Sequence, residues 1–193
     1  SLVGSEMCIR DRLIALLHDI GRFEQLKRYD SFEPGTMDHA AYGVKVLFDE
    51  GMIRRFLPDD KWDSIIYTAI AHHSDYELPE ISDPQTLLHA KLIRDEDKLD
   101  NCRVKLVDST STFINVSEEE LGTQNITQKV YETVFENKCI LSADRVTQMD
   151  YWVSYIVYFF DINFKESFDI IAENDYLNRI IDRISYSNPV TKE

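Results

Sequence analysis

Four of the five histidines in the chain lie where imidazole rings could bind a metal ion. His18 and Asp19 are adjacent in the stretch LLHDIGRF, His39 comes early in a later helical segment, and His72 and His73 end a third segment. Imidazole and carboxylate groups are ligands of zinc, manganese, iron and cobalt in proteins. Because adjacent residues of a helix point about 100° apart, His18 could bind one ion while Asp19 bridges two.

A further carboxylate, Asp97, lies on the apolar side of a predicted helix. Ala90 and Ile93 precede it at helical spacing, which places the acid in line with a buried stripe. A buried, unpaired carboxylate is costly, and metal coordination is one way to offset the cost. Each observation has a simpler explanation alone, since a lone histidine is usually a core residue and DEDKLD is by default a solvated face. Taken together, they predict a metal centre.

Helical periodicity extends over almost the whole chain, and no alternating strand pattern occurs. The sequence predicts a helix over 13–20 ended by Gly21, a loop over 23–35, a helix capped by Thr36 and closed by Gly51, a helix over 61–73 capped by Asp59 or Asp60, and a long helix opened by Asp83 and Pro84. Further helical segments are expected near 127–138, 144–161 and 164–185, the last broken near Asn174. The fold is therefore expected to be all-α.

The chain is expected to have four parts: a non-native leader over 1–12, a metal-binding helical core over 13–106 that is truncated at its N-terminus, a loop over 107–126 with a capped turn at Ser117, and C-terminal helices over 127–193 that pack on the core. The leader, SLVGSEMCIRDR, lacks the apolar region of a signal peptide. Its MCIRDR part resembles the translation of an adapter used in DNA sequencing libraries. We therefore expect residues 1–11 to make few core contacts.

The composition excludes several classes of partner. Asp and Glu number 35 against 21 Lys and Arg, a net charge of −14, and this charge repels the phosphate backbone of a nucleic-acid polymer. The longest apolar stretch, YWVSYIVYFF, is too short for the ~20 residues of a spanning helix, so no membrane partner is expected. The three cysteines lack metal-binding spacing and suit a reducing cytoplasm.

The ordered set of HDIG, His39, HH and the Asp97 of DEDKLD resembles the HD-domain superfamily of metal-dependent phosphohydrolases, over roughly residues 13–105. The resemblance implies an HD-domain-like helical bundle with additional C-terminal helices. It also implies one or two divalent ions, which could be Mn, Fe, Zn, Co or Mg. Its implied ligands are His18, Asp19 and Asp97 for the first ion, with Asp19 as a bridge, and His39 with His72 or His73 for the second.

One departure from the family concerns its first histidine, which lies upstream of the HD pair. No histidine precedes His18 in this chain. Truncation of the native sequence would explain the difference and would weaken binding of the first metal. His89 is not part of the family pattern and is expected at the surface or the edge of the core.

The implied activity is hydrolysis of a phosphomonoester or phosphodiester by metal-activated water. Asp19 and Lys98 are the candidate catalytic residues, and Lys98 and Arg22 are candidate phosphate contacts. The competing hypothesis is a non-catalytic regulatory or ligand-binding module stabilised by metal. A third hypothesis is a helical scaffold whose histidines are incidental and bind no metal.

The substrate is expected to be a nucleotide or another small phosphoester. The stretch HHSDYELPE lacks the GYP sequence of the cyclic-di-GMP branch, and HDIGRFEQ offers only Glu24 where the guanosine-alarmone branch has an acidic pair. Both branches are therefore disfavoured. Tyr76 and Phe23 could stack on a base, although either could equally pack in the core.

Overall fold

The computed structural model describes residues 2–32 and 35–193, with side chains in the first helix described from Cys8 onward. None of these residues lies in a β-strand, so the predicted all-α class is confirmed. Two compact units make up the chain, Ser1–Glu96 and Asp97–Glu193. Their boundary falls inside a long helix, earlier than the predicted end of the metal-binding core at residue 106.

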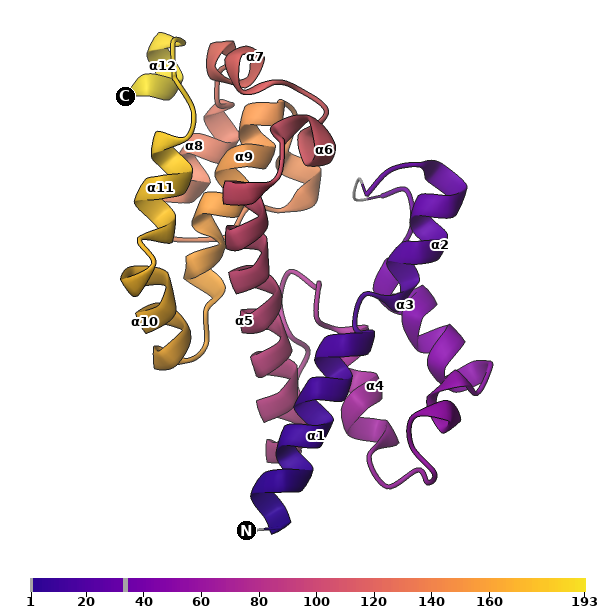
Figure 1. Ribbon diagram of the computed structural model, residues 1–193. Coiled ribbons are helices and arrows are strands. Elements are labelled where there is room, and N and C mark those ends of the chain that lie inside the picture. The colour runs from indigo at the N-terminus through magenta and orange to yellow at the C-terminus, as the bar shows by residue number, and fades with distance from the viewer. Residues whose placement is uncertain (1, 33–34) are drawn as a thin grey trace. The chain divides into compact units, whose positions relative to one another are not determined.

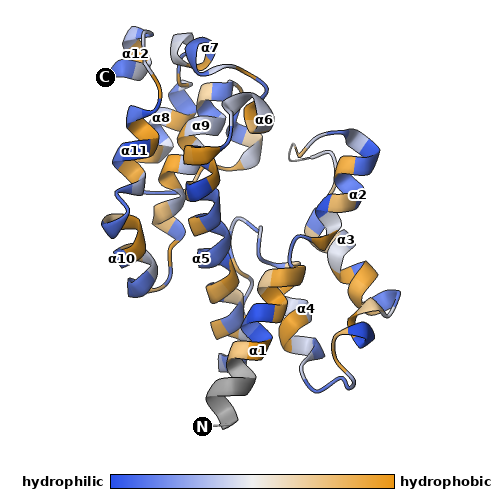
Figure 2. Ribbon diagram, in the orientation of Figure 1, coloured by the Kyte–Doolittle hydropathy of each residue, from blue (hydrophilic) through white to orange (hydrophobic). Residues whose placement is uncertain are grey.

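The first unit contains α1 (Leu2–Leu17), α2 (Ile20–Tyr29), α3 (His39–Val44), η1 (Lys45–Asp49, a π-helix), η2 (Met52–Arg55), α4 (Asp63–Ala71) and the first part of α5 (Pro84–Val107) (Figure 1). Figure 2 shows that α4 and the C-terminal end of α1 are largely hydrophobic. Ile14 and Leu17 of α1, Ile66 and Ile70 of α4, and Leu47 of η1 are buried and form one core cluster. This core fixes the ends of the helices that carry the predicted ligands.

Gly21 does not end a helix as predicted, since it lies inside α2, and α2 occupies much of the predicted loop over 23–35. The glycine is required by a close contact between helices. A Cβ atom at position 21 would lie 2.0 Å from the carbonyl oxygen of His39 and 3.0 Å from the backbone nitrogen of Gly43. The glycine thus allows α2 to lie directly against the start of α3.

Two predicted helix ends are confirmed. Asp83 precedes Pro84, the first residue of α5, and its Oδ2 accepts a hydrogen bond of 2.7 Å from the backbone nitrogen of Thr86. Gly51 adopts a positive φ of 76° after the helical run that ends at Asp49.

The predicted caps of α3 and α4 are wrong. Asp38, not Thr36, caps α3, and its side chain accepts from the backbone nitrogen of Ala41. Helix α4 begins at Asp63 after Trp62, later than Asp59 or Asp60 would allow. Several polar residues stand before each of these helices, and their order alone does not single out the one that caps.

Two residues in the described part of the predicted leader, Arg10 and Asp11, make side-chain contacts within the first unit. Arg10 is buried, and its guanidinium carbon lies 5.4 Å from the centroid of the Trp62 ring. Asp11 is hydrogen-bonded to Nδ1 of His89. His89 is only 2% exposed, which corrects its expected position at the surface or core edge. The side chains of residues 1–7 lie outside the described part of the chain, so the expectation for them stays a prediction.

The second unit comprises the rest of α5, α6 (Thr110–Ile114), α7 (Glu118–Thr123), α8 (Gln128–Phe135), η3 (Ser142–Asp144), α9 (Gln148–Ile156), η4 (Val157–Asp161), α10 (Lys165–Glu173), α11 (Tyr176–Asp182) and α12 (Pro189–Lys192). The break near Asn174 is confirmed, since Asp175 adopts a left-handed conformation between α10 and α11. The core of the second unit contains the fully buried residues Trp152, Leu121, Met149 and Ile180.

The segment 107–126 is not the loop that its composition indicates, because it contains α6 and α7. Both helices are too short to produce a periodic pattern in the sequence. The predicted cap at Ser117 is confirmed, since its Oγ accepts from the backbone nitrogen of Glu120. In the described part of the chain, no helix combines the length and apolar character that crossing a bilayer requires.

Candidate metal centre

Three helix ends of the first unit bring histidine side chains to one carboxylate. His18 and Asp19 occupy the turn between α1 and α2, and His39 is the first residue of α3. His73 lies two residues beyond the end of α4. The contact of Gly21 with the backbone of His39 brings the start of α3 close to the turn that holds Asp19.

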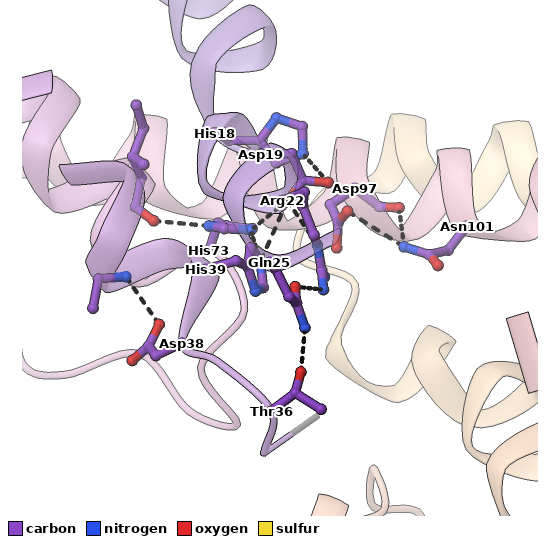
Figure 3. A network of polar contacts seen from close by, with 12 residues as sticks. His18, Asp19, Arg22, Gln25, Thr36, Asp38, His39, His73, Asp97 and Asn101 are labelled. Carbon is purple, nitrogen blue, oxygen red and sulfur yellow. Dashed lines mark hydrogen bonds and ion pairs between the residues drawn. The ribbon is translucent and has the colours of Figure 1, made fainter. Parts of the chain in front are cut away.

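The imidazole Nε2 atoms converge on Asp19 (Figure 3). Nε2 of His39 lies 3.3 Å from Oδ1 of Asp19, and Nε2 of His73 lies 3.5 Å from the same oxygen. The two Nε2 atoms are 3.1 Å apart. Nε2 of His18 lies 3.8 Å from the other carboxylate oxygen, Oδ2. Ligand atoms of His18, Asp19 and His73 all lie within 4.8 Å of one another, close enough to hold a metal ion.

Backbone carbonyls orient two of these rings. Nδ1 of His18 donates to the carbonyl oxygen of Ala15 at 2.8 Å, and Nδ1 of His73 donates to that of Ile70 at 2.8 Å. In a neutral ring, a proton on Nδ1 leaves Nε2 with a free lone pair. Such contacts to the second ring nitrogen are typical of metal-binding histidines, because they fix both the tautomer and the ring orientation.

The surroundings keep the carboxylate charged and favour a neutral His39. Desolvation by itself raises the pKa of Asp19, but the close contacts with the side chains of His39 and His73, together with the charges of Arg22 and His18, outweigh it. The pKa of Asp19 is therefore well below its usual value. Burial lowers the pKa of His39, although Asp19 acts in the opposite direction. An ionised carboxylate and neutral imidazole are the forms that bind metals.

A polar chain extends from Asp19 along α2. Nε of Arg22 donates to Oδ1 of Asp19 at 3.3 Å, and one of its terminal nitrogens donates to Oε1 of Gln25 at 3.1 Å. The amide of Gln25 donates to Oγ1 of Thr36 at 2.8 Å. Gln25 is fully buried, and these hydrogen bonds hold the guanidinium of Arg22 beside the carboxylate (Figure 3).

The other predicted site residues lie apart from this set or in the second unit. The His72 side chain is 33% exposed, and its Nδ1 donates to Asp75 at 2.6 Å. The structure thus brings His73, and not His72, to Asp19. In the second unit, Asp97 accepts from the amide of Asn101 at 3.3 Å, and Nζ of Lys98 lies 2.8 Å from Oδ2 of Asp161.

Sequence reasoning missed Gln25 and Arg94, two buried polar residues near the histidines. Arg94 donates hydrogen bonds to the main chain around His72 and His73. It follows Ile93 on the same helical face as Ala90, so the stripe that singled out Asp97 could also have identified it. No comparable sequence signal marks Gln25.

Comparison with known proteins gives a match to one family model. No curated protein matches the chain, and no solved structure does. The family model described as HD domain matches residues 9–102, a range that contains every histidine discussed above together with Asp19 and Asp97. Residues 9–102 of this chain therefore belong to the HD domain family.

Proposed function

We propose that this protein is a metal-dependent phosphohydrolase that acts on a small phosphomonoester or phosphodiester. The observation that carries the proposal is the convergence of three imidazole Nε2 atoms on the carboxylate of Asp19. The match to the HD domain supports it, because this family consists largely of metal-dependent phosphohydrolases.

The donor set fits one or two divalent ions. Oδ1 of Asp19 faces His39 and His73 while Oδ2 faces His18, so the two oxygens could serve different ions. This division supports a bridging role for Asp19. Imidazole-rich sites suit Mn, Fe, Co and Zn better than Mg, which prefers oxygen ligands. Asp97 joins the proposed ligand set on the family resemblance alone.

A divalent ion at such a site would lower the pKa of a bound water and neutralise charge on a phosphoryl group. The chain's own contribution is to hold its ligands and to bind the substrate. The guanidinium of Arg22, fixed by Gln25 beside Asp19, is suited to donate hydrogen bonds to a phosphate oxygen. Lys98 remains a candidate for phosphate binding or catalysis and would have to leave Asp161 to act.

The proposed substrate is a nucleotide or another small phosphoester in the cytoplasm. The net charge of −14 disfavours a nucleic-acid polymer, whereas a small anion can be held by a local cation. Tyr76 is 40% exposed and Phe23 is 78% exposed, so both aromatic side chains are accessible for stacking.

A non-catalytic module stabilised by metal is the second candidate. Arg22 and the histidines already surround Asp19 with protein contacts, and such a network could serve as a binding or regulatory centre without hydrolysis. The two candidates make the same prediction for metal content and opposite predictions for turnover.

The test combines metal analysis with a substrate screen. The purified protein would be analysed for bound metal and assayed with p-nitrophenyl phosphate, bis-p-nitrophenyl phosphate and a panel of nucleotides, each with Mn, Fe, Co, Zn or Mg. We expect bound transition metal and turnover, both lost in Asp19→Asn. Metal without turnover would favour the module, and the absence of metal binding would refute both.

A further inference from the structure

Arg94 is a buried arginine that binds the main chain at the end of α4. It is 2% exposed. One terminal nitrogen donates to the carbonyl oxygens of His72 at 3.1 Å, His73 at 3.5 Å and Asp75 at 2.6 Å, and the other donates to that of Tyr76 at 3.3 Å. Four successive or nearly successive carbonyls are thus gathered around one guanidinium.

These contacts provide hydrogen-bond donors for carbonyl groups just beyond the end of α4. Carbonyls in the last turn of an α-helix and just beyond it have no intrahelical partner, and buried carbonyls without partners are costly. Arginine presents several N–H donors in a rigid planar fork, and its charge also complements the negative end of the helix dipole. Arg94 therefore fixes the course of the main chain after Ala71.

The imidazole rings of the two adjacent histidines in this turn point in different directions. The His73 ring turns inward, with Nδ1 bound to Ile70 and Nε2 directed at Asp19. The His72 ring turns outward and binds Asp75. Because the ring directions follow from the backbone of this turn, the residue that holds the turn also selects the histidine that reaches Asp19.

We propose that Arg94 is a positioning residue for His73, and through it for the metal centre. The inference rests on the proposed function for its metal-binding part, whereas its effect on the His73 ring can be tested without metal. Lysine at position 94 keeps the charge but not the fork, since one ammonium group cannot reproduce the planar set of donors.

The test compares Arg94→Lys with Arg183→Lys. Arg183 also donates to main-chain carbonyls, those of Lys105 and Asp108 at the end of α5, but it serves no histidine turn. In the metal-free protein, we expect Arg94→Lys to shift the ring nitrogen NMR signals of His73 and His39 and to leave those of the buried His89 unchanged. Arg183→Lys should leave all three unchanged.

The second readout is cobalt binding. Loss of a contact that orients a metal ligand typically weakens affinity ~10- to 100-fold. We expect Arg94→Lys to lower Co²⁺ affinity by at least ~10-fold and to alter the visible absorption of bound Co²⁺, while Arg183→Lys does neither. If the wild type binds no Co²⁺ but the His73 signals still shift, the proposed function fails and the positioning role stands.

Two results would overturn the positioning role. One is an Arg94→Lys variant whose His73 signals match those of the wild type. The other is unfolding of Arg94→Lys and of Arg94→Gln alike while Arg183→Lys stays folded, because Arg94 would then serve general stability. Arg94→Gln retains a side-chain donor without the charge, which makes it the milder second variant.

Discussion

Both ring nitrogens of His73 contact protein groups, whereas the contact of His72 is made by its Nδ1 atom. Nδ1 of His73 donates to Ile70, and its Nε2 lies near Asp19 and His39. Nδ1 of His72 donates to Asp75 on the exposed side of the turn. The two residues share a motif but have different surroundings.

Substitution of the two histidines should therefore have unequal effects. We expect His73→Ala to weaken Zn²⁺ or Co²⁺ binding by well over ~10-fold, the order that loss of a direct ligand or its support produces. His72→Ala should change the affinity by less than ~3-fold, since it removes only a contact with Asp75. Isothermal titration of both variants measures the difference. Equal losses would show that the turn rearranges when metal binds.

A second substitution tests the hydrogen bond between Asp11 and His89. His89 is 2% exposed and bonded to Asp11 through Nδ1, so removal of the carboxylate leaves a buried ring nitrogen without its partner. We expect Asp11→Ala to lower the free energy of unfolding by ~1–3 kcal/mol. Asp182→Ala, at an exposed position of α11, is the control and should change little. Urea denaturation measures both, and an unaltered Asp11→Ala would mean that the hydrogen bond between Asp11 and His89 contributes no stability.

At the scale of elements, the contact between α2 and α3 depends on glycine. A Cβ at position 21 would meet the carbonyl oxygen of His39 at 2.0 Å, whereas the atom nearest to a Cβ at position 43 would be Cγ2 of Ile20, at 3.3 Å. Both glycines lie in helices. The first can accept no side chain without a shift of the backbone that carries His39.

We expect Gly21→Ala to lower the free energy of unfolding by ~1–3 kcal/mol or more, as overpacking does. Gly43→Ala is the matched control, since alanine gains helix propensity there and the methyl group of Ile20 can move slightly. Thermal unfolding of both variants provides the measurement. A Gly21→Ala protein as stable as Gly43→Ala would contradict the close approach of the two helices.

A buried lysine on α5 makes the second unit sensitive to pH. Nζ of Lys105 lies 4.2 Å from the centroid of the Phe113 ring and 4.0 Å from that of the Tyr155 ring. Burial lowers the pKa of Lys105 to about 8, against the raising effect of Asp97 and other nearby groups. Because the folded state binds this proton more weakly than the unfolded state, stability should rise with pH between about 8 and 10.5.

Replacement of Lys105 by methionine should remove this dependence. We expect the stability of Lys105→Met relative to the wild type to be greatest near neutral pH and to fall as pH rises above about 8. Urea denaturation at several pH values up to about 9.5 measures the difference, with the exposed Lys129→Met as the control. A difference that stays constant with pH would place the Lys105 pKa at its ordinary value.

The elements also explain why the sequence predicts some of this site and not the rest. Ligand chemistry restricts which residue types can meet, so HDIG, His39 and HH identify residues that do lie together in the first unit. The choice between His72 and His73 depends on a turn held by Arg94 from another helix, and no local pattern contains that information. Gly21 was expected to end a helix because glycine often does. Its actual role is a tertiary contact, which local propensity cannot reveal.

At the scale of the whole molecule, the chain consists of two compact units, and the histidines of the candidate metal centre all belong to the first. A ligand that binds only the folded state stabilises it by an amount set by its concentration relative to Kd, ~2.7 kcal/mol at 100 times Kd. If the ion is held within the first unit, that stabilisation should be local, because separate compact units can open independently.

Hydrogen exchange with and without Zn²⁺ tests this expectation. We expect added Zn²⁺ to slow amide exchange in α3 and in α4 with the turn that follows it, and to leave α9 and α11 unchanged. The Asp19→Asn variant should show no protection in either unit, which separates site binding from weak association of Zn²⁺ with the acidic surface. Protection that extends to Asp97 and Asn101 would add Asp97 to the ligand set, as the family resemblance implies. Equal protection of α9 would instead mean either that the two units unfold together or that Zn²⁺ binds outside the histidine cluster. The Asp19→Asn variant distinguishes these cases. Protection of α9 should disappear in this variant if the units unfold together, and should persist if Zn²⁺ binds elsewhere.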